Sequence, residues 1–186
     1  MTKILDRLPM TGQSEELRFQ DRSLPIHPNQ LIAWVSVHLA GATSPEPNTP
    51  YFPALIDTGS NFGFTLQERH LNDWAGIRPE RLRVIGARRL DGRHVPCRAA
   101  TVWLYANRPG TREPFAGRPP VCLEISKGIA VVPENSVQAE PRLPLLGLSA
   151  FAGNELDFWF DSEMRHFYLR RLRWRSSIVR LLYRWL

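Results

Sequence analysis

The stretch PALIDTGSNFGFTL, residues 53–66, places a carboxylate where a buried strand meets a tight turn. The apolar run 54–56 predicts a strand that delivers Asp57 at its end, and Gly59 permits a sharp turn and a close approach of the backbone. Burying an unpaired charge is costly, so this carboxylate is either a solvated turn residue that caps its own backbone or a group with a chemical use.

The residues around Asp57 suit a rigidly held carboxylate. Thr58 and Ser60 place hydroxyl groups beside it, and such donors stabilise an ionised carboxylate. If a second identical carboxylate lies within about 3 Å, the two share one proton. The ionised member can then take a proton from water while the other donates to a substrate carbonyl, which is general acid–base hydrolysis of an amide.

A second copy of the motif is missing from the sequence, which contains no other Asp-Thr-Gly or Asp-Ser-Gly. The pair Asp91-Gly92 lacks the hydroxyl residue and instead predicts the tip of a hairpin. A pair of carboxylates therefore requires a second chain. A two-fold axis is the natural place for Asp57 to meet its own copy, so we expect a homodimer.

The composition predicts one mostly β domain. The chain has 186 residues, 43% of them apolar and 23% charged, which is enough for a sizeable core without global disorder. Sixteen prolines and several short β-branched runs predict short strands with one or two short helices. The local patterns predict a strand over residues 31–39, a short helix or helical turn over 66–77 and a hairpin over 155–172. We expect a poorly structured N-terminal arm over residues 1–29, the β domain over 30–172, and a basic amphipathic helix over 173–186.

Charge and cysteine content limit the cofactors and partners. Arginine supplies nearly all of the net charge of +6, but no nucleic-acid-reading motif accompanies it, so nucleic acid is not an expected partner. Cys97 and Cys122 lack metal-site spacing, so we expect two reduced thiols, no metal and no other cofactor. Neither a signal peptide nor a membrane-spanning stretch is recognisable, which predicts a cytoplasmic protein.

Three features together resemble the retropepsin-like aspartic proteases, the single-domain family of retroviral proteases and their bacterial relatives. ALIDTGSNFGFTL resembles the active-site segment of that family, and Leu145-Leu146-Gly147 resembles the later segment that packs beneath the site before a short helix. The hairpin between them, residues 82–97, falls where the family places its flap. The resemblance covers roughly residues 31–170 and implies a retropepsin-like acid-protease barrel.

The resemblance implies a homodimeric aspartic endopeptidase that hydrolyses a peptide or protein substrate. It matches Asp57 to the catalytic aspartate, and Thr58 to a threonine whose hydroxyl reaches the partner chain's backbone. Gly59 matches a glycine near substrate and water, and Ser60 a serine that can hydrogen-bond the aspartate. The flap residues expected to contact substrate are Ile85, Gly86, Ala87, Leu90, Asp91 and Gly92.

Two departures leave alternatives open. The retroviral flap is rich in glycine, whereas this one carries three arginines and one histidine, which also fits a catalytically inactive retropepsin-like binding module. The tail at 173–186 suits a helix packed on its own domain or on a dimer partner. It equally suits weak contact with an anionic membrane, which would place the protein at the inner membrane face.

Overall fold

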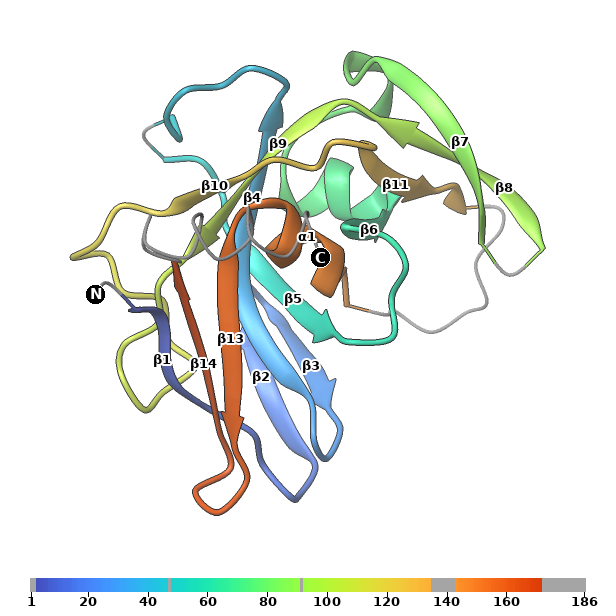
Figure 1. Cartoon of the computed structure of the whole chain (residues 1–186). Coiled ribbons are helices and arrows are strands. Elements are labelled where there is room, and N and C mark those ends of the chain that lie inside the picture. Colours follow the sequence, from blue (N-terminus) through green and yellow to red (C-terminus); the bar gives the residue numbers. More distant parts are fainter. Residues whose placement is uncertain (1–2, 47, 91, 135–142, 172–186) are drawn as a thin grey trace, which may run out of the picture.

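The computed structural model describes residues 3–46, 48–90, 92–134 and 143–171, and this part of the chain is mostly β, as predicted. Strands form a nine-stranded sheet, a three-stranded sheet of order β1-β14-β13, and the β2–β3 hairpin (Figure 1). The nine-stranded sheet has the order β10-β9-β4-β5-β12-β6-β11-β8-β7 and does not close into a barrel among the described residues. Its strands are β4 (Leu31–Leu39), β5 (Phe52–Asp57), β6 (Phe64–Gln67), β7 (Val84–Leu90), β8 (Arg93–Arg98), β9 (Ala100–Tyr105), β10 (Val121–Leu123), β11 (Ile129–Val132) and β12 (Leu145–Gly147).

The strand β4 lies at the centre of the core, and it confirms the strand predicted over residues 31–39. It pairs antiparallel with β5 on one side and with β9 on the other. Its first eight residues are all buried, so both faces of the sheet are covered at this point. A continuous apolar run, rather than strict alternation, is what a strand covered on both faces requires.

The N-terminal segment is ordered, so the prediction of a poorly structured arm over residues 1–29 is wrong for the described residues 3–29. Three strands form there: β1 (Lys3–Pro9), β2 (Glu15–Phe19) and β3 (Arg22–Ile26). The side chains of Leu5 and Leu8 are buried in the main core, and β1 pairs with β14 (His166–Arg171). Register shifts within β1 place its apolar residues out of simple alternation, so the period-two signal of a strand is lost from the sequence.

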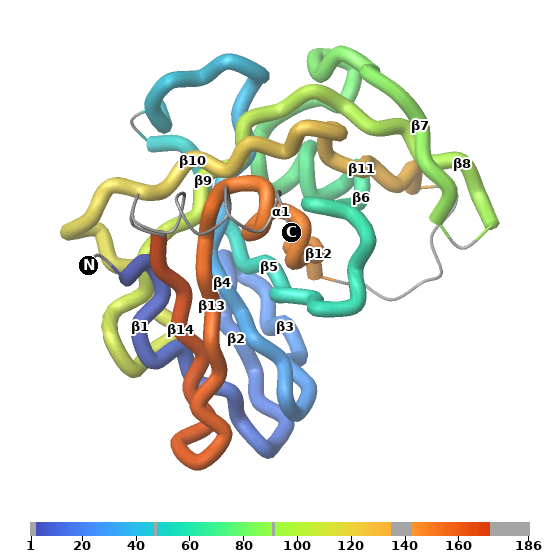
Figure 2. Tube along the Cα trace, viewed as in Figure 1, coloured from blue at the N-terminus to red at the C-terminus, as the bar shows by residue number. Residues whose placement is uncertain are grey.

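Two hairpins follow the sequence prediction. Strands β7 and β8 pair antiparallel around the turn at Gly92, although Asp91 itself lies outside the described residues. Strands β13 (Leu156–Asp161) and β14 form the hairpin predicted over residues 155–172. Figure 2 shows that the β7–β8 hairpin lies at one end of the nine-stranded sheet, away from the three-stranded sheet.

Helical segments are short. The short helix or helical turn predicted over residues 66–77 is a π-helical turn, η1 (His70–Trp74), and a 3₁₀ turn follows at η2 (Pro79–Arg81). The helix α1 (Leu148–Gly153) begins directly after β12. Within the ranges described above, no helix has the length and apolar character needed to cross a membrane. The helix predicted over 173–186 lies outside the described residues.

Candidate active site

Asp57 is the last residue of β5, as predicted, and it is positioned by two neighbouring strands. β5 pairs antiparallel with β4 and parallel with β12, with Asp57 in register with Gly147. β12 therefore lies between β5 and β6, the two strands that the Asp57 loop connects. The end of β5 is therefore held by β4 on one side and by β12 on the other, and the carboxylate is half-buried at the start of the loop.

The loop backbone holds the carboxylate. The backbone N–H of Gly59 donates to Oδ1 of Asp57 at 2.9 Å, and the N–H of Ser60 donates to the carbonyl oxygen of Asp57 at 3.4 Å. A Cβ at position 59 would lie 3.5 Å from the same Oδ1, which is an ordinary van der Waals distance, so this hydrogen bond does not itself require a glycine. The contact suits both a rigidly held catalytic carboxylate and an aspartate that caps its own turn.

The two hydroxyl residues are used differently. The Ser60 hydroxyl donates to the carbonyl oxygen of Phe62 at 3.4 Å, and the N–H of Phe62 lies 3.3 Å from Ser60 Oγ. Ser60 therefore stabilises its own loop in the single chain, instead of making the hydrogen bond to Asp57 that the resemblance implies. Thr58 is exposed. An exposed side chain at this position remains accessible to a second chain.

Gly147 lies directly beneath the Asp57 loop. Its N–H donates to the carbonyl oxygen of Gly63 at 3.0 Å. A Cβ at this position would lie 2.0 Å from the carbonyl oxygen of Phe62 and 3.1 Å from that of Ser60, so no side chain fits. Leu146, the preceding residue, is fully buried in the main core. The segment Leu145–Gly147 thus packs against the loop, and α1 follows it.

The predicted flap is an exposed hairpin at the edge of the nine-stranded sheet. β7 is the outermost strand, and Ile85, Gly86 and Ala87 are all exposed. Leu90 is half-buried and packs with the small cluster of Phe62, Val95 and Ala130. The structure therefore brings the Leu90 end of the flap against the residue that follows the Asp57 turn. Gly92, at the hairpin turn, has φ of +80°, which glycine adopts without strain.

Arg88 is a site residue that sequence reasoning counted only as flap charge. Its Nη1 donates to the carbonyl oxygen of Asn61 at 3.1 Å, and its Cζ lies 4.4 Å from the centre of the Phe62 ring. Both partners belong to the loop that carries Asp57. The sequence signal that could have identified Arg88 was the period-two alternation of a strand. It places Arg88 on the same face of β7 as Leu90, and both residues are half-buried.

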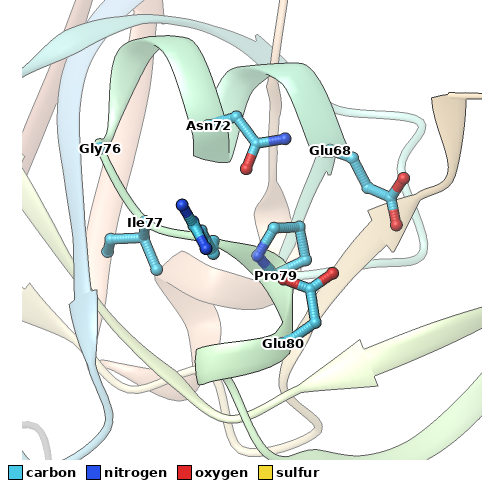
Figure 3. A pocket seen from close by; sticks show the side chains of 7 residues that line it. Glu68, Asn72, Gly76, Ile77, Pro79 and Glu80 are labelled. Carbon is cyan, nitrogen blue, oxygen red and sulfur yellow. The ribbon is translucent and has the colours of Figure 1, made fainter.

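Other candidate features lie apart from this loop. Burial raises the pKa of both Cys97, which is buried, and Cys122, which is half-buried. Among the described residues, no group of three or more histidine, cysteine or acidic side chains could hold a metal ion. A cavity of about 520 Å³ lies between η1 and η2 and is lined by Glu68, Asn72 and Glu80 (Figure 3). None of the predicted site residues lines it.

Comparison of the chain with protein-family models, with curated protein sequences and with solved structures finds no match. The function of the chain is therefore inferred from the geometry around Asp57.

Proposed function

We propose that the chain is a homodimeric aspartic endopeptidase with a retropepsin-like fold. The observation that carries the proposal is the position of β12 beneath the Asp57 loop. Gly147 fits there only because it has no side chain, and the loop delivers a half-buried carboxylate whose Oδ1 accepts a backbone N–H. Such support restricts the carboxylate to a narrow set of positions, which a pair of groups separated by about 3 Å requires.

The reaction uses Asp57 from each of two chains, with one proton shared between them. The ionised carboxylate accepts a proton from water, and the water oxygen forms a bond to the carbonyl carbon of the substrate. The protonated carboxyl group donates its proton to the carbonyl oxygen, which gives a tetrahedral diol. The carboxyl group that received the water's proton then gives it to the amide nitrogen, while the other carboxylate takes a proton from one hydroxyl of the diol. The carbon–nitrogen bond breaks, an amine and a carboxylic acid leave, and the pair again holds one proton without any covalent bond between enzyme and substrate.

The flap supplies the substrate-binding side of the cleft. β7 is an edge strand, and the backbone groups on its outer side have no strand partner among the described residues. An extended peptide can pair with such an edge, which gives affinity through main-chain hydrogen bonds and selectivity through alternate side chains. In this proposal, Ile85, Gly86, Ala87, Leu90 and Gly92 form the flap surface that covers the peptide, and Asp91 lies outside the described residues.

The substitution Asp57→Asn tests the proposal. Asparagine keeps an oxygen that can accept the Gly59 N–H, so the loop and the fold should survive, but it cannot take a proton from water. We expect cleavage of a peptide library, measured by mass spectrometry from about pH 4 to about pH 8, to fall about 10³-fold. Circular dichroism and a thermal melt establish that the variant is folded.

Asp161→Asn is the matched control for this experiment. Asp161 also accepts a backbone N–H within its own turn, from Met164 at 3.0 Å, so the same chemical change is made at a turn carboxylate elsewhere. This control should keep the wild-type rate. If folded Asp57→Asn protein cleaves peptides at the wild-type rate, the proposal is wrong.

A retropepsin-like binding module without protease activity is the second candidate. The observation that favours it is the contact of Arg88 with the Asp57 loop, because this contact holds the flap against the loop in the free chain. The two candidates are separated by a statine-type transition-state analogue. The protease binds it more tightly than the equivalent peptide and loses this advantage in Asp57→Asn, whereas the binding module binds peptide and analogue alike.

A further inference from the structure

Arg88 connects the flap to the loop after Asp57 through weak interactions. Its hydrogen bond to Asn61 is solvent-exposed and ends on a neutral carbonyl oxygen. Its second contact is with the face of the Phe62 ring. A guanidinium group has five N–H donors in a planar fork that matches both oxygens of a carboxylate. Its present partners therefore use only part of its binding capacity.

Within the described chain, no carboxylate forms a salt bridge with Arg88. The surrounding hairpin is basic, because Arg89 lies opposite His94 and Leu90 lies opposite Arg93 in the β7–β8 register. In residues 84–98, the one acidic residue of the sequence is Asp91, which lies outside the described residues. A negatively charged group that enters here meets a field of the opposite sign.

The position of Arg88 places this charge beside the path of a substrate. Its side chain extends from the edge strand β7 to Asn61, four residues after Asp57. A peptide held between the flap and the Asp57 loop must therefore pass the guanidinium group. A carboxylate is a stronger partner for that group than a neutral carbonyl, because both bonds are charge-assisted and the pairing is bidentate.

We propose that Arg88 determines substrate specificity by binding the carboxylate of an aspartate or glutamate in the peptide. In the free chain the guanidinium rests on the Asn61 carbonyl and the Phe62 ring. On binding, the carboxylate takes the place of the Asn61 carbonyl, while the Phe62 ring continues to support the guanidinium plane. This inference rests on the proposed function and adds a substrate class to it, namely acidic peptides.

The test compares matched acidic and amide peptides. A peptide that the wild-type chain of 186 residues cleaves is selected from a random library. It is then synthesised with each aspartate or glutamate replaced in turn by asparagine or glutamine. We expect kcat/KM for the wild type to fall about tenfold or more at one acidic position, which is the size of effect of one charged hydrogen bond. Arg88→Gln should remove this difference, and Arg88→Lys should restore part of it.

Arg89→Gln is the matched control, because Arg89 is the adjacent residue on the same strand, is exposed and points to the opposite face. It loses the same charge and should keep the acidic preference. Equal rates for acidic and amide peptides in the wild type would overturn the inference, and so would a preference that survives in Arg88→Gln.

Binding measurements separate this inference from the proposed function. Fluorescence anisotropy of labelled acidic and amide peptides is measured with folded wild type and Arg88→Gln. An Arg88-dependent preference for the acidic peptide without any cleavage supports the inference and contradicts the protease. Cleavage without that preference supports the protease and contradicts the inference. If wild type neither binds nor cleaves any peptide of the library, both are wrong.

Discussion

The imidazole ring of His70 is 1% exposed and lies against the ring of Trp74, with 4.4 Å between the ring centres. Its Nδ1 accepts the N–H of Gln67 at 3.1 Å, so the proton of the neutral ring is on Nε2. Burial, together with the positive charges of Arg69 and Arg22, lowers the pKa of His70 from 6.5 to about 3, and burial is the largest of these causes. The folded chain therefore keeps this residue neutral.

This burial makes the fold sensitive to acid. Between pH 6.5 and about 3 the unfolded chain binds a proton at His70 that the folded chain does not bind, so stability decreases as the pH falls. At about pH 5 the loss is roughly 2 kcal/mol relative to neutral pH. His70→Asn keeps an acceptor for the Gln67 N–H but does not titrate, so its free energy of unfolding in urea should lose about 2 kcal/mol less over that pH range.

His27→Asn serves as the control for that measurement, since the His27 side chain is exposed. It should retain the wild-type pH dependence. An equal loss of stability in wild type and His70→Asn would show that His70 is not responsible. The expected result also sets a limit on the proposed enzyme, because the shared proton favours activity in acid while His70 weakens the fold there.

At the scale of elements, the contact between β12 and the Asp57 loop determines the position of the carboxylate. In Gly147→Ala the added Cβ would lie 2.0 Å from the backbone oxygen of Phe62. A backbone atom cannot rotate away from this clash as a side chain can. Either the loop or β12 must shift. We expect a loss of at least about 2 kcal/mol in the free energy of unfolding, measured in urea. Loss of any activity that depends on Asp57 should accompany it.

Gly153→Ala provides the comparison, because a Cβ at the end of α1 meets nothing within 4 Å. This change should be neutral or slightly stabilising, since alanine restricts the unfolded chain more than glycine does. Similar unfolding free energies for the two variants would mean that the Asp57 loop is free to move away from β12, and the argument for a rigid carboxylate would fail.

Elements with a local signal were predictable from the sequence. The strand that delivers Asp57, the buried run at 31–39 and the hairpin around Gly92 each contain their apolar pattern and their turn within a few residues. The strand β1 was not predictable in this way, because its register shifts break the alternation of buried residues. Its pairing with β14 also joins segments at opposite ends of the chain, which no local pattern records.

The candidate site also contains features that the sequence predicts and features that only the tertiary fold determines. The resemblance placed Asp57 and Gly147 in adjoining segments, and the strand register brings them side by side. The partner of the Ser60 hydroxyl and the contact of Arg88 with Asn61 depend on how the loop closes and how the flap lies over it. Residues 61 and 88 are 27 positions apart, and only the tertiary fold brings them together.

At the scale of the whole molecule, the chain carries one copy of a group that the proposed chemistry needs twice. Asp57 occurs at the end of a single β5, and no second Asp-Thr-Gly is present in the sequence. The proposed chemistry therefore requires an assembly of at least two chains. A dimer with two-fold symmetry brings the same residue of each chain to the axis, so each active site contains Asp57 from both subunits.

Subunit mixing tests this requirement directly. Wild-type protein is incubated with a threefold excess of Asp57→Asn until the subunits exchange. With random pairing, about one quarter of the wild-type subunits have a wild-type partner. Because a mixed dimer holds one carboxylate and one amide, it cannot share a proton, and activity per wild-type subunit should fall to about a quarter. The same mixture assayed before exchange is the control and should show no loss. Activity that stays constant after exchange, in a sample that light scattering shows to be dimeric, would mean that Asp57 acts within one chain.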